Sequence, residues 1–244
     1  MVYDYPKYYE IAFSFIDSKK QIDFFEKLSN KYGIGINKIL DVACGPSVQA
    51  EEILKRGYGL VLLDLNKSMI EYVKIKYPKA EAIKADMCNF KLKGTVDFAF
   101  IMMGSISYMK NNEDFLNHLN CMSKALNKGG LYFIENTRLN WKGLEGKQNW
   151  DEEKDGIKID ASYEIKVENE LKQILFEEMI LKVNDNGKKR VLKESISLKH
   201  MFPEEYKLLI EKQGDFDFLG FFDHFKDKQL NDSKQFNFML LKKK

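Results

Sequence analysis

The sequence predicts an α/β protein with a doubly wound, mostly parallel sheet of seven strands and an antiparallel β insertion before the closing helix and strands. Two patterns along the chain support this fold class. From Lys38 to Glu135, short apolar runs alternate with segments of helical spacing, which is typical of parallel strands connected by helices. Beyond Asn136, apolar and polar residues alternate strictly, as in a half-buried antiparallel strand.

In the first half of the chain, each apolar run ends at a turn signal, and we assign strand and helix in turn. The first run, Lys38 to Ala43, stops at a Cys-Gly-Pro-Ser turn, and Gly57 ends the helix that follows. The expected strands are 38–43, 60–63, 81–85, 96–101 and 130–135. The expected helices are 48–56, 68–77 and about 112–127, preceded by two helices or one broken helix up to about residue 30.

The second half reads as antiparallel strands followed by a return to the first sheet. Apolar residues alternate with polar ones from Ile157 to Val167, and two more strand-like runs flank the turn signal Asn184-Asp185-Asn186-Gly187. Those two runs are about 173–183 and 190–198. A helix from Pro203 to about Gln213 and strands 216–222 and 236–241 then complete the sheet.

Composition and length narrow the class of protein. The 244 residues are 44% hydrophobic, with 39 Lys and Arg against 37 Asp and Glu, a formal net charge of +2. A chain of this kind is globular, and its near-zero charge weakly opposes nucleic-acid binding. Its three cysteines are far apart and no apolar run approaches 18 residues, so we expect a cytoplasmic protein with no membrane segment. A monomer and a homodimer both remain open.

Polar residues gather where ligands bind in open parallel sheets, beyond the carboxyl ends of the strands. Gly45 lies in the turn after the first strand, Asp64 ends the second strand and Asp86 ends the third. Two carboxylate oxygens of Asp64 could accept both hydroxyls of a ribose, with Asp86 beside the base. Each residue alone could be structural, as a turn glycine or a helix-capping aspartate. Together they indicate an adenosine site, and the absence of a Gly-x-Gly-x-x-Gly loop disfavours a dinucleotide.

At this point the sequence resembles the class I S-adenosylmethionine-dependent methyltransferases. The resemblance covers about residues 39 to 136, and its motifs occur in the family's order and spacing. They are ILDVACGPS, VLLDLNKSMIEYVK, AIKADMCNF, VDFAFIMMGSISYM and LNKGGLYFIEN. The resemblance implies a Rossmann-like fold, S-adenosylmethionine as cofactor and S-adenosylhomocysteine as product.

The same resemblance implies which residues contact the cofactor. Cys44 and Gly45 would line the methionine moiety, Asp64 the ribose, Leu65 and Met87 the faces of the adenine, Asp86 its amino group, and Met102 and Met103 the sulfonium side. The full expected set is Asp41, Ala43, Cys44, Gly45, Ser47, Asp64, Leu65, Met69, Asp86, Met87, Met102 and Met103. Ser47 departs from the family pattern, which has a second glycine there.

The N-terminal YYEIAF segment and the β insertion look like those of the small-molecule methyltransferases, in which an insertion covers the active site. We therefore divide the chain into an N-terminal helical cap and cofactor-binding core (1–142), an insertion acting as a substrate lid (143–200) and a closing part of the core (201–244). Candidate catalytic residues are Tyr9, Tyr108 and His200, and Trp141 and Arg138 could also border the acceptor. For each tyrosine a core or rim position is the structural alternative, and for His200 a hydrogen-bonded or surface position.

Missing motifs narrow the function further. The fourth strand is followed by Met103-Gly104-Ser105-Ile106 instead of the Asn/Asp-Pro-Pro-aromatic signature of nucleic-acid base methyltransferases. The strand ends carry too few carboxylates for a catechol-type magnesium site, so we expect no metal. The sequence predicts methyl transfer to a nitrogen or oxygen of a small molecule by in-line displacement. A non-catalytic module that binds S-adenosylmethionine or S-adenosylhomocysteine, with the insertion as a partner surface, is the alternative.

Overall fold

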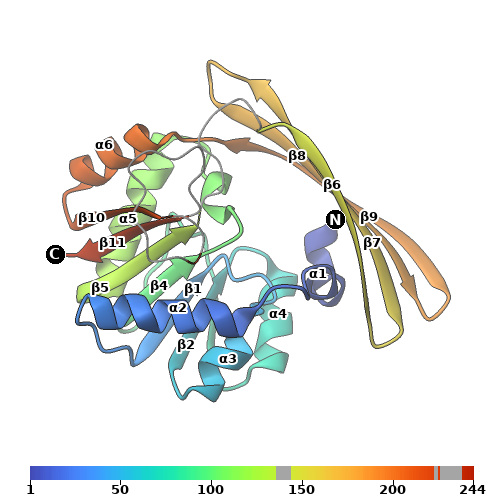
Figure 1. Ribbon diagram of the computed structural model, residues 1–244, viewed down its shortest axis with the longest axis horizontal. Coiled ribbons are helices and arrows are strands. Elements are labelled where there is room, and N and C mark those ends of the chain that lie inside the picture. Colours follow the sequence, from blue (N-terminus) through green and yellow to red (C-terminus); the bar gives the residue numbers. More distant parts are fainter. Residues whose placement is uncertain (136–143, 223–224, 226–237) are drawn as a thin grey trace.

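The computed structural model describes residues 1–135, 144–222, 225 and 238–244. They form a larger α/β part and a separate, curved antiparallel sheet (Figure 1). The helices of the described residues are η1 (Val2–Asp4), α1 (Pro6–Ala12), α2 (Ser18–Lys31), α3 (Ala50–Lys55), α4 (Lys67–Lys76), η2 (Ser105–Tyr108), α5 (Asn112–Ala125) and α6 (Pro203–Gln213). The strands of the larger part are β1 (Lys38–Val42), β2 (Gly59–Asp64), β3 (Glu81–Lys84), β4 (Val96–Ile101), β5 (Leu126–Glu135), β10 (Phe216–Phe222) and β11 (Phe238–Lys243).

The predicted seven-stranded sheet is confirmed, with the order β10-β11-β5-β4-β1-β2-β3. The pairs from β3 through β5 are parallel, whereas β11 runs antiparallel to β5 and to β10. The strand order reverses between β1 and β4, because the chain first builds outward through β2 and β3 and then returns. Ligands of open sheets bind at such a reversal, outside the carboxyl ends of the strands.

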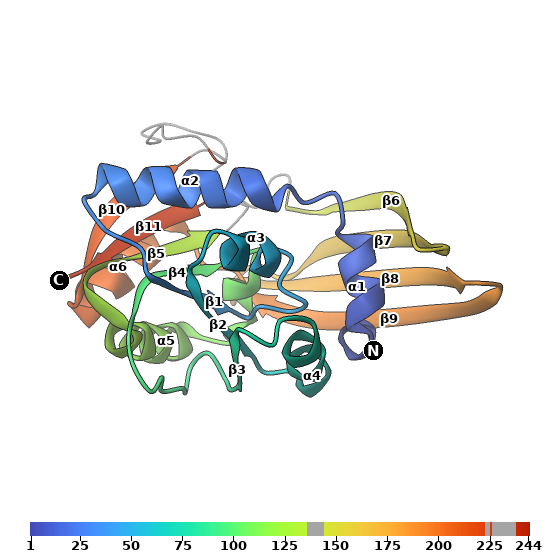
Figure 2. The same ribbon diagram turned by 90° about the horizontal axis from the view of Figure 1, so that it is seen from below.

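Two apolar clusters cover the two faces of this sheet. On one face, Phe25 of α2 and Ile53 of α3 pack with Phe98 and Phe133 of the sheet. On the other, residues of α5 and α6 pack against β4, β5 and β11. Figure 2 shows α2 along one face and α5 on the opposite one. Both faces are therefore shielded, as the continuous apolar runs of β1, β2 and β4 require.

The antiparallel sheet, called the insertion sheet below, has the order β6-β7-β8-β9. Its strands are β6 (Gly146–Lys154), β7 (Ile157–Asn169), β8 (Ile174–Asp185) and β9 (Lys188–Lys199). The predicted hairpin turn lies between β8 and β9, where Asn186 and Gly187 have φ of 51° and 89°. Positive φ at both turn residues is the geometry of a two-residue hairpin. β6 was not predicted, because its nine residues, GKQNWDEEK, have no apolar alternation.

The N-terminal segment packs on the insertion sheet. Val2, Ile11 and Phe13 are buried in one cluster with Ile159 and Leu181 of the sheet. In Figure 1, α1 accordingly lies between the insertion sheet and the larger part. The predicted N-terminal helical cap therefore contacts both sheets, because α2 packs on the parallel sheet and α1 packs on the insertion sheet. The boundaries at 142 and 200 remain a prediction.

Three polar contacts tie this N-terminal segment to both parts of the molecule. The backbone N–H of Val2 donates to Glu194 of β9 at 3.0 Å. The carboxylate of Glu10 in α1 binds Tyr72 and Lys76, both on α4. The segment therefore connects the insertion sheet to a helix of the parallel sheet. Within the described residues, no helix has the length and apolar character needed to span a membrane.

Candidate functional site

The turn after β1 has an unusual backbone that buries a polar pair. Ala43, Gly45 and Ser47 have φ of 54°, 52° and 50°, a region that only glycine adopts freely. Ser47 is 1% exposed, and its hydroxyl donates to Asp41 Oδ2 at 2.6 Å. This bond explains how a serine replaces the family's second glycine: its side chain turns inward, away from the space in front of the turn.

Asp64, at the end of β2, joins the turn to the following helix. Its Oδ2 accepts the N–H of Gly45 at 2.8 Å, and its Oδ1 accepts that of Asn66 at 2.7 Å. Burial raises the pKa of Asp64, against the opposing effect of the backbone N–H groups that it accepts. Leu65 next to it is 64% exposed, whereas Met69, in the first turn of α4, is buried. Leu65 therefore presents an apolar surface beside a carboxylate, as a stacked adenine needs.

The segment after β3 carries the third acidic position. Asp86 is exposed, and its Oδ1 accepts the N–H of Cys88 at 2.8 Å. Met87 is half-buried and packs against the apolar cluster of α5. The backbone N–H of Ala85 donates to the carbonyl oxygen of Asp64 at 3.0 Å, so this segment lies beside the end of β2.

Met102 and Met103 follow β4, the neighbour of β1. Met102 is 7% exposed, while Met103 is 40% exposed, with φ of 56° and its N–H bonded to Glu135. Since β1 and β4 are paired up to Val42 and Ile101, these methionines and the Ala43–Ser47 turn leave the sheet side by side. The structure thus brings the expected cofactor residues to one edge of the sheet, and their contacts with a cofactor remain predictions.

The backbone of the turn is uncovered at Gly45. A methyl group added to the Cα of Gly45 would meet no atom within 4 Å, so the backbone there is open to a ligand. Asp64 ends β2, Leu65 follows it directly, and Asp86 lies two residues beyond the end of β3, the neighbour of β2. These residues would hold the ribose and the adenine, and the turn would hold the methionine moiety.

Three tyrosines from separate segments form what we call the phenol cluster: Tyr3, Tyr9 and Tyr108. The hydroxyls of Tyr3 and Tyr108 are hydrogen-bonded, and the rings of Tyr3 and Tyr9 are 5.6 Å apart. Burial first, and then neighbouring groups, raise the pKa of all three phenols, so they are neutral hydrogen-bonding groups. The cluster includes two of the predicted catalytic residues.

Besides burial, the charges of two carboxylates raise the pKa values of the phenol cluster. The charge of Asp64, at the cofactor edge, raises the pKa of Tyr9, and so does that of Glu177 on β8. Glu177 also raises the pKa of Tyr3 and Tyr108. Tyr9 is therefore near both the expected cofactor position and the insertion sheet.

Sequence reasoning missed Tyr3, Glu177 and Glu194. Strand alternation places Glu177 on the same face of β8 as the buried Leu175 and Met179, the face toward α1. Glu194 shares the inward face of β9 with Leu192 and Leu198 in the same way. The sequence contained a signal for the two glutamates. Each stands at a position of its strand where the alternation calls for an inward-facing apolar residue.

His200 lies at the end of β9 and is 2% exposed. Its backbone N–H donates to the Gln173 carbonyl at 2.7 Å, and its ring centroid is 5.0 Å from that of Phe202. These contacts join it to the insertion sheet and to the start of α6, and a catalytic role remains a prediction. Arg138 and Trp141 lie outside the described residues.

The two hollows described for this structure are not lined by any of the expected cofactor residues. Hollows of about 410 Å³ and 310 Å³ lie on the outer face of the insertion sheet and beside Glu26 and Tyr58. In the part of the chain that the structure describes, no three His, Cys, Asp or Glu side chains are grouped to hold a metal ion. The expectation that no metal is needed stays a prediction.

The buried Asp41 predicts a pH-dependent stability. Burial raises the pKa of Asp41 to about 8, with Ser47 lowering it and Asp64 raising it. The folded protein therefore keeps a proton that the unfolded chain releases above its ordinary pKa of about 4. The contribution of Asp41 to stability is fully present below about pH 4 and is lost as the pH rises toward about 8. Thermal unfolding of Asp41→Asn should show a shallower fall in Tm between pH 5 and 8 than the wild type. Parallel profiles would place the ionisation elsewhere.

The doubly wound sheet, with Asp64 at the end of β2, Asp86 shortly after β3 and an open turn after β1, is a fold shared with solved S-adenosylmethionine-dependent methyltransferases. Within it, residues 39–130 match the sequence family described as "Methyltransferase domain".

Three relatives illustrate the similarity. A dTDP-3-amino-3,4,6-trideoxy-alpha-D-glucopyranose N,N-dimethyltransferase from Streptomyces venezuelae is 26% identical over 99 residues, 41% of this chain and 42% of that protein, so less than half of the relative is matched. The crystal structure of an S-adenosylmethionine-dependent methyltransferase from Clostridium acetobutylicum has a TM-score of 0.80 at 18% identity, covering 96% of this chain and 95% of that chain. An S-adenosylmethionine-bound amino pentose methyltransferase from Micromonospora echinaspora has a TM-score of 0.77 at 15% identity, covering 97% and 96%. At these identities the two structures show a common fold.

Proposed function

We propose that the protein transfers a methyl group from S-adenosylmethionine to a nitrogen of a small molecule bound between the parallel sheet and the insertion sheet. The observation that carries the proposal is the phenol cluster, in which Tyr3 and Tyr9 of the segment that packs on the insertion sheet meet Tyr108, which follows β4 of the parallel sheet. The division of the chain into core (1–142 and 201–244) and lid (143–200) belongs to the same proposal. So does action in the cytoplasm, with which the three free thiols agree.

The cofactor would supply a methyl group on a sulfonium, and the chain's own residues would bind and align the acceptor. Such a transfer depends more on alignment and exclusion of water than on strong acid or base groups. Val2, Phe13 and Leu181 seal the N-terminal segment against the insertion sheet, so bulk water is kept from this side. The phenol cluster offers neutral hydroxyls that can orient a polar acceptor.

The carboxylates of the insertion sheet favour nitrogen over oxygen as the nucleophile. An aliphatic amine is protonated at neutral pH, and its nitrogen must lose a proton before it can take a methyl group. Glu177, facing inward near three phenols, would bind the ammonium and accept that proton, later passing it to water. An alcohol must also give up its proton to a base, but it carries no positive charge for an inward-facing carboxylate to bind. The names of the Streptomyces and Micromonospora relatives, an N,N-dimethyltransferase and an amino pentose methyltransferase, support the same choice.

Calorimetry tests the cofactor. S-adenosylmethionine and S-adenosylhomocysteine should bind, and NAD at the same concentration should not, because the turn after β1 has no phosphate cradle and Pro46 lacks an N–H. Binding of NAD alone would overturn the proposal. Binding of the adenosyl ligands without transfer to any member of an amine and alcohol panel would favour the non-catalytic alternative.

Two neighbouring glutamates on opposite faces of β8 test the acceptor. Glu177→Gln should slow methylation of an amine acceptor by roughly ten- to a hundredfold, the value of one charge-assisted hydrogen bond. Glu178→Gln is the matched control, because Glu178 faces outward and pairs with Lys193. We expect that variant to keep wild-type rates. Equal rates for Glu177→Gln and the wild type would remove this carboxylate from the acceptor site.

A further inference from the structure

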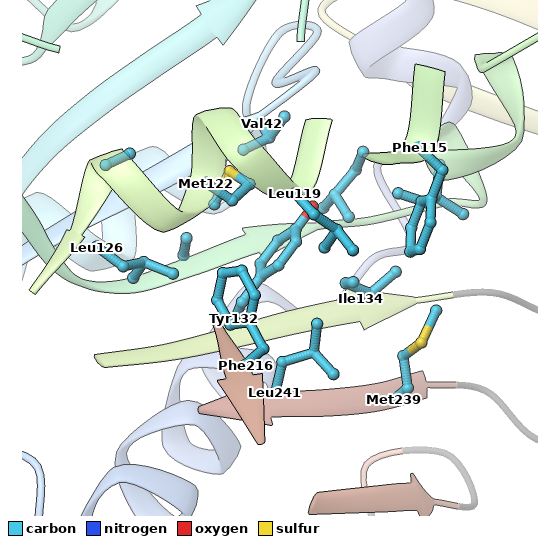
Figure 3. Packing of buried hydrophobic residues seen from close by; sticks show 14 of the residues in the cluster. Val42, Phe115, Leu119, Met122, Leu126, Tyr132, Ile134, Phe216, Met239 and Leu241 are labelled. Carbon is cyan, nitrogen blue, oxygen red and sulfur yellow. The ribbon is translucent and has the colours of Figure 1, made fainter. Parts of the chain in front are cut away.

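A buried histidine lies between α5 and β5, and it has no role in the site described above. His118 of α5 is 0% exposed, among the side chains that pack on the sheet. Its Nδ1 lies 2.9 Å from the carbonyl oxygen of Met87, and its Nε2 lies 2.6 Å from the hydroxyl of Tyr132. Figure 3 shows Tyr132 of β5 beneath Leu119 and Met122 of α5, the helix that carries His118.

The direction of each hydrogen bond follows from the groups involved. A carbonyl oxygen only accepts, so the nitrogen facing Met87 must carry the hydrogen. Burial lowers the pKa of His118 to about 4, so the ring is neutral near pH 7 and has one N–H. Nε2 therefore accepts the hydroxyl of Tyr132, whose own pKa burial raises well above its ordinary value. The chain of bonds runs from Tyr132 through His118 to the backbone of Met87.

Cys121, one turn further along α5, contacts the same segment. Its thiol donates to the Cys88 carbonyl, with the two atoms 3.6 Å apart, and Phe90 N lies 3.5 Å from its sulfur. Residues 85–90 belong to no described strand, and their regular pairing is limited to one bridge between Asp86 and Asn89. The backbone from Met87 to Phe90 is thus held from α5 as well as by its own turn.

We propose that His118 is a positioning residue for the cofactor's base: by holding the Met87 carbonyl, it sets where Asp86 and Met87 meet the adenine, and so it supports the selection of adenine. The inference rests on the proposed function. Without the histidine, the Met87 carbonyl loses its buried donor and the segment can shift. A shift would weaken the hydrogen bond between Asp86 and the adenine amino group more than it would weaken contacts at the ribose.

The test compares two ligands that differ only at the base. S-inosylhomocysteine carries an oxygen where S-adenosylhomocysteine carries the amino group. In the wild type, S-adenosylhomocysteine should bind more tightly. In His118→Phe, which fills the site without a nitrogen, the ratio of the two dissociation constants should fall at least about fivefold. His118→Asn, whose amide can donate to Met87 from nearly the position of Nδ1, should recover most of the ratio.

Tyr132→Phe is the matched control, since it removes the other hydrogen bond of His118 from the same cluster and leaves Nδ1 facing Met87. At similar stability it should keep the ratio within about twofold. If His118→Phe does not fold, His118→Leu is measured in its place. An unchanged ratio in a folded His118→Phe or His118→Leu, or an equal fall in Tyr132→Phe, would overturn the inference. A wild type that binds neither ligand would instead reject the proposed function.

Discussion

Removal of the insertion sheet together with the N-terminal segment that packs on it should abolish methyl transfer and leave the parallel core folded. The two clusters that cover the core sheet contain no residue of β6–β9. Residues 2–13, in contrast, bury Val2, Ile11 and Phe13 against the insertion sheet, and excision of the sheet alone would expose them. The truncated protein should therefore begin near Asp17, which caps α2. A short glycine-serine link should replace residues 143–198.

The expected effect on transfer is a loss of at least about a hundredfold, because an acceptor no longer held in line loses alignment and protection from water. Binding of S-adenosylhomocysteine should largely survive. Circular dichroism and thermal unfolding establish that the core is folded before activity is compared. A truncated protein that methylates the same acceptor at a similar rate would show that the insertion does not cover the active site.

Asp64→Ala should weaken S-adenosylhomocysteine by about 1.5–3 kcal/mol, or roughly ten- to a hundredfold, since charge-assisted hydrogen bonds to the ribose hydroxyls are lost. The structure adds a second consequence, because Asp64 also accepts the N–H groups of Gly45 and Asn66. Part of the loss would therefore come from a less ordered turn.

Asp97 provides a control, because its carboxylate, like that of Asp64, accepts two backbone N–H groups. It accepts the N–H groups of Asn37 and Lys38 at 2.8 Å and 3.1 Å, at the opposite, amino end of β1. Asp97→Ala should lower stability and leave the affinity of the folded protein for S-adenosylhomocysteine unchanged. If Asp64→Ala and Asp97→Ala have the same affinity, Asp64 does not contact the ribose.

The parallel core was predictable because local pattern and burial agree there. Strands with both faces covered read as apolar runs, and β4 at Val96–Ile101 was predicted with its observed bounds. Glycine and proline mark the ends of elements, as at Pro203 and Gly214 around α6. The strand-end acids were predictable for the same reason, since the end of each strand is local information.

The edge strand β6 was not predictable in this way. Seven of its nine residues are exposed, and its place is decided by pairing with β7, from Gly146 opposite Ile165 to Lys154 opposite Ile157. Pairing between strands depends on partners and not on the apolar pattern of one segment. Trp150 contributes the strand's anchor, donating from its ring nitrogen to the Ala12 carbonyl of α1 at 2.6 Å.

The sequence by itself determined the class of fold, and it predicted the cofactor edge and the resemblance to a family, because periodicity, turn residues and short motifs are properties of neighbouring residues. Only the tertiary structure decided which distant side chains meet. Tyr3 is hydrogen-bonded to Tyr108, and Glu177 of β8 adds to the burial that raises the pKa of both. His118, which has no motif around it, connects Tyr132 to Met87. The hydrogen bonds of Tyr3 with Tyr108 and of His118 with Tyr132 join residues 105 and 14 positions apart, and their geometry follows from the packing of whole elements, which a pattern in one segment does not contain.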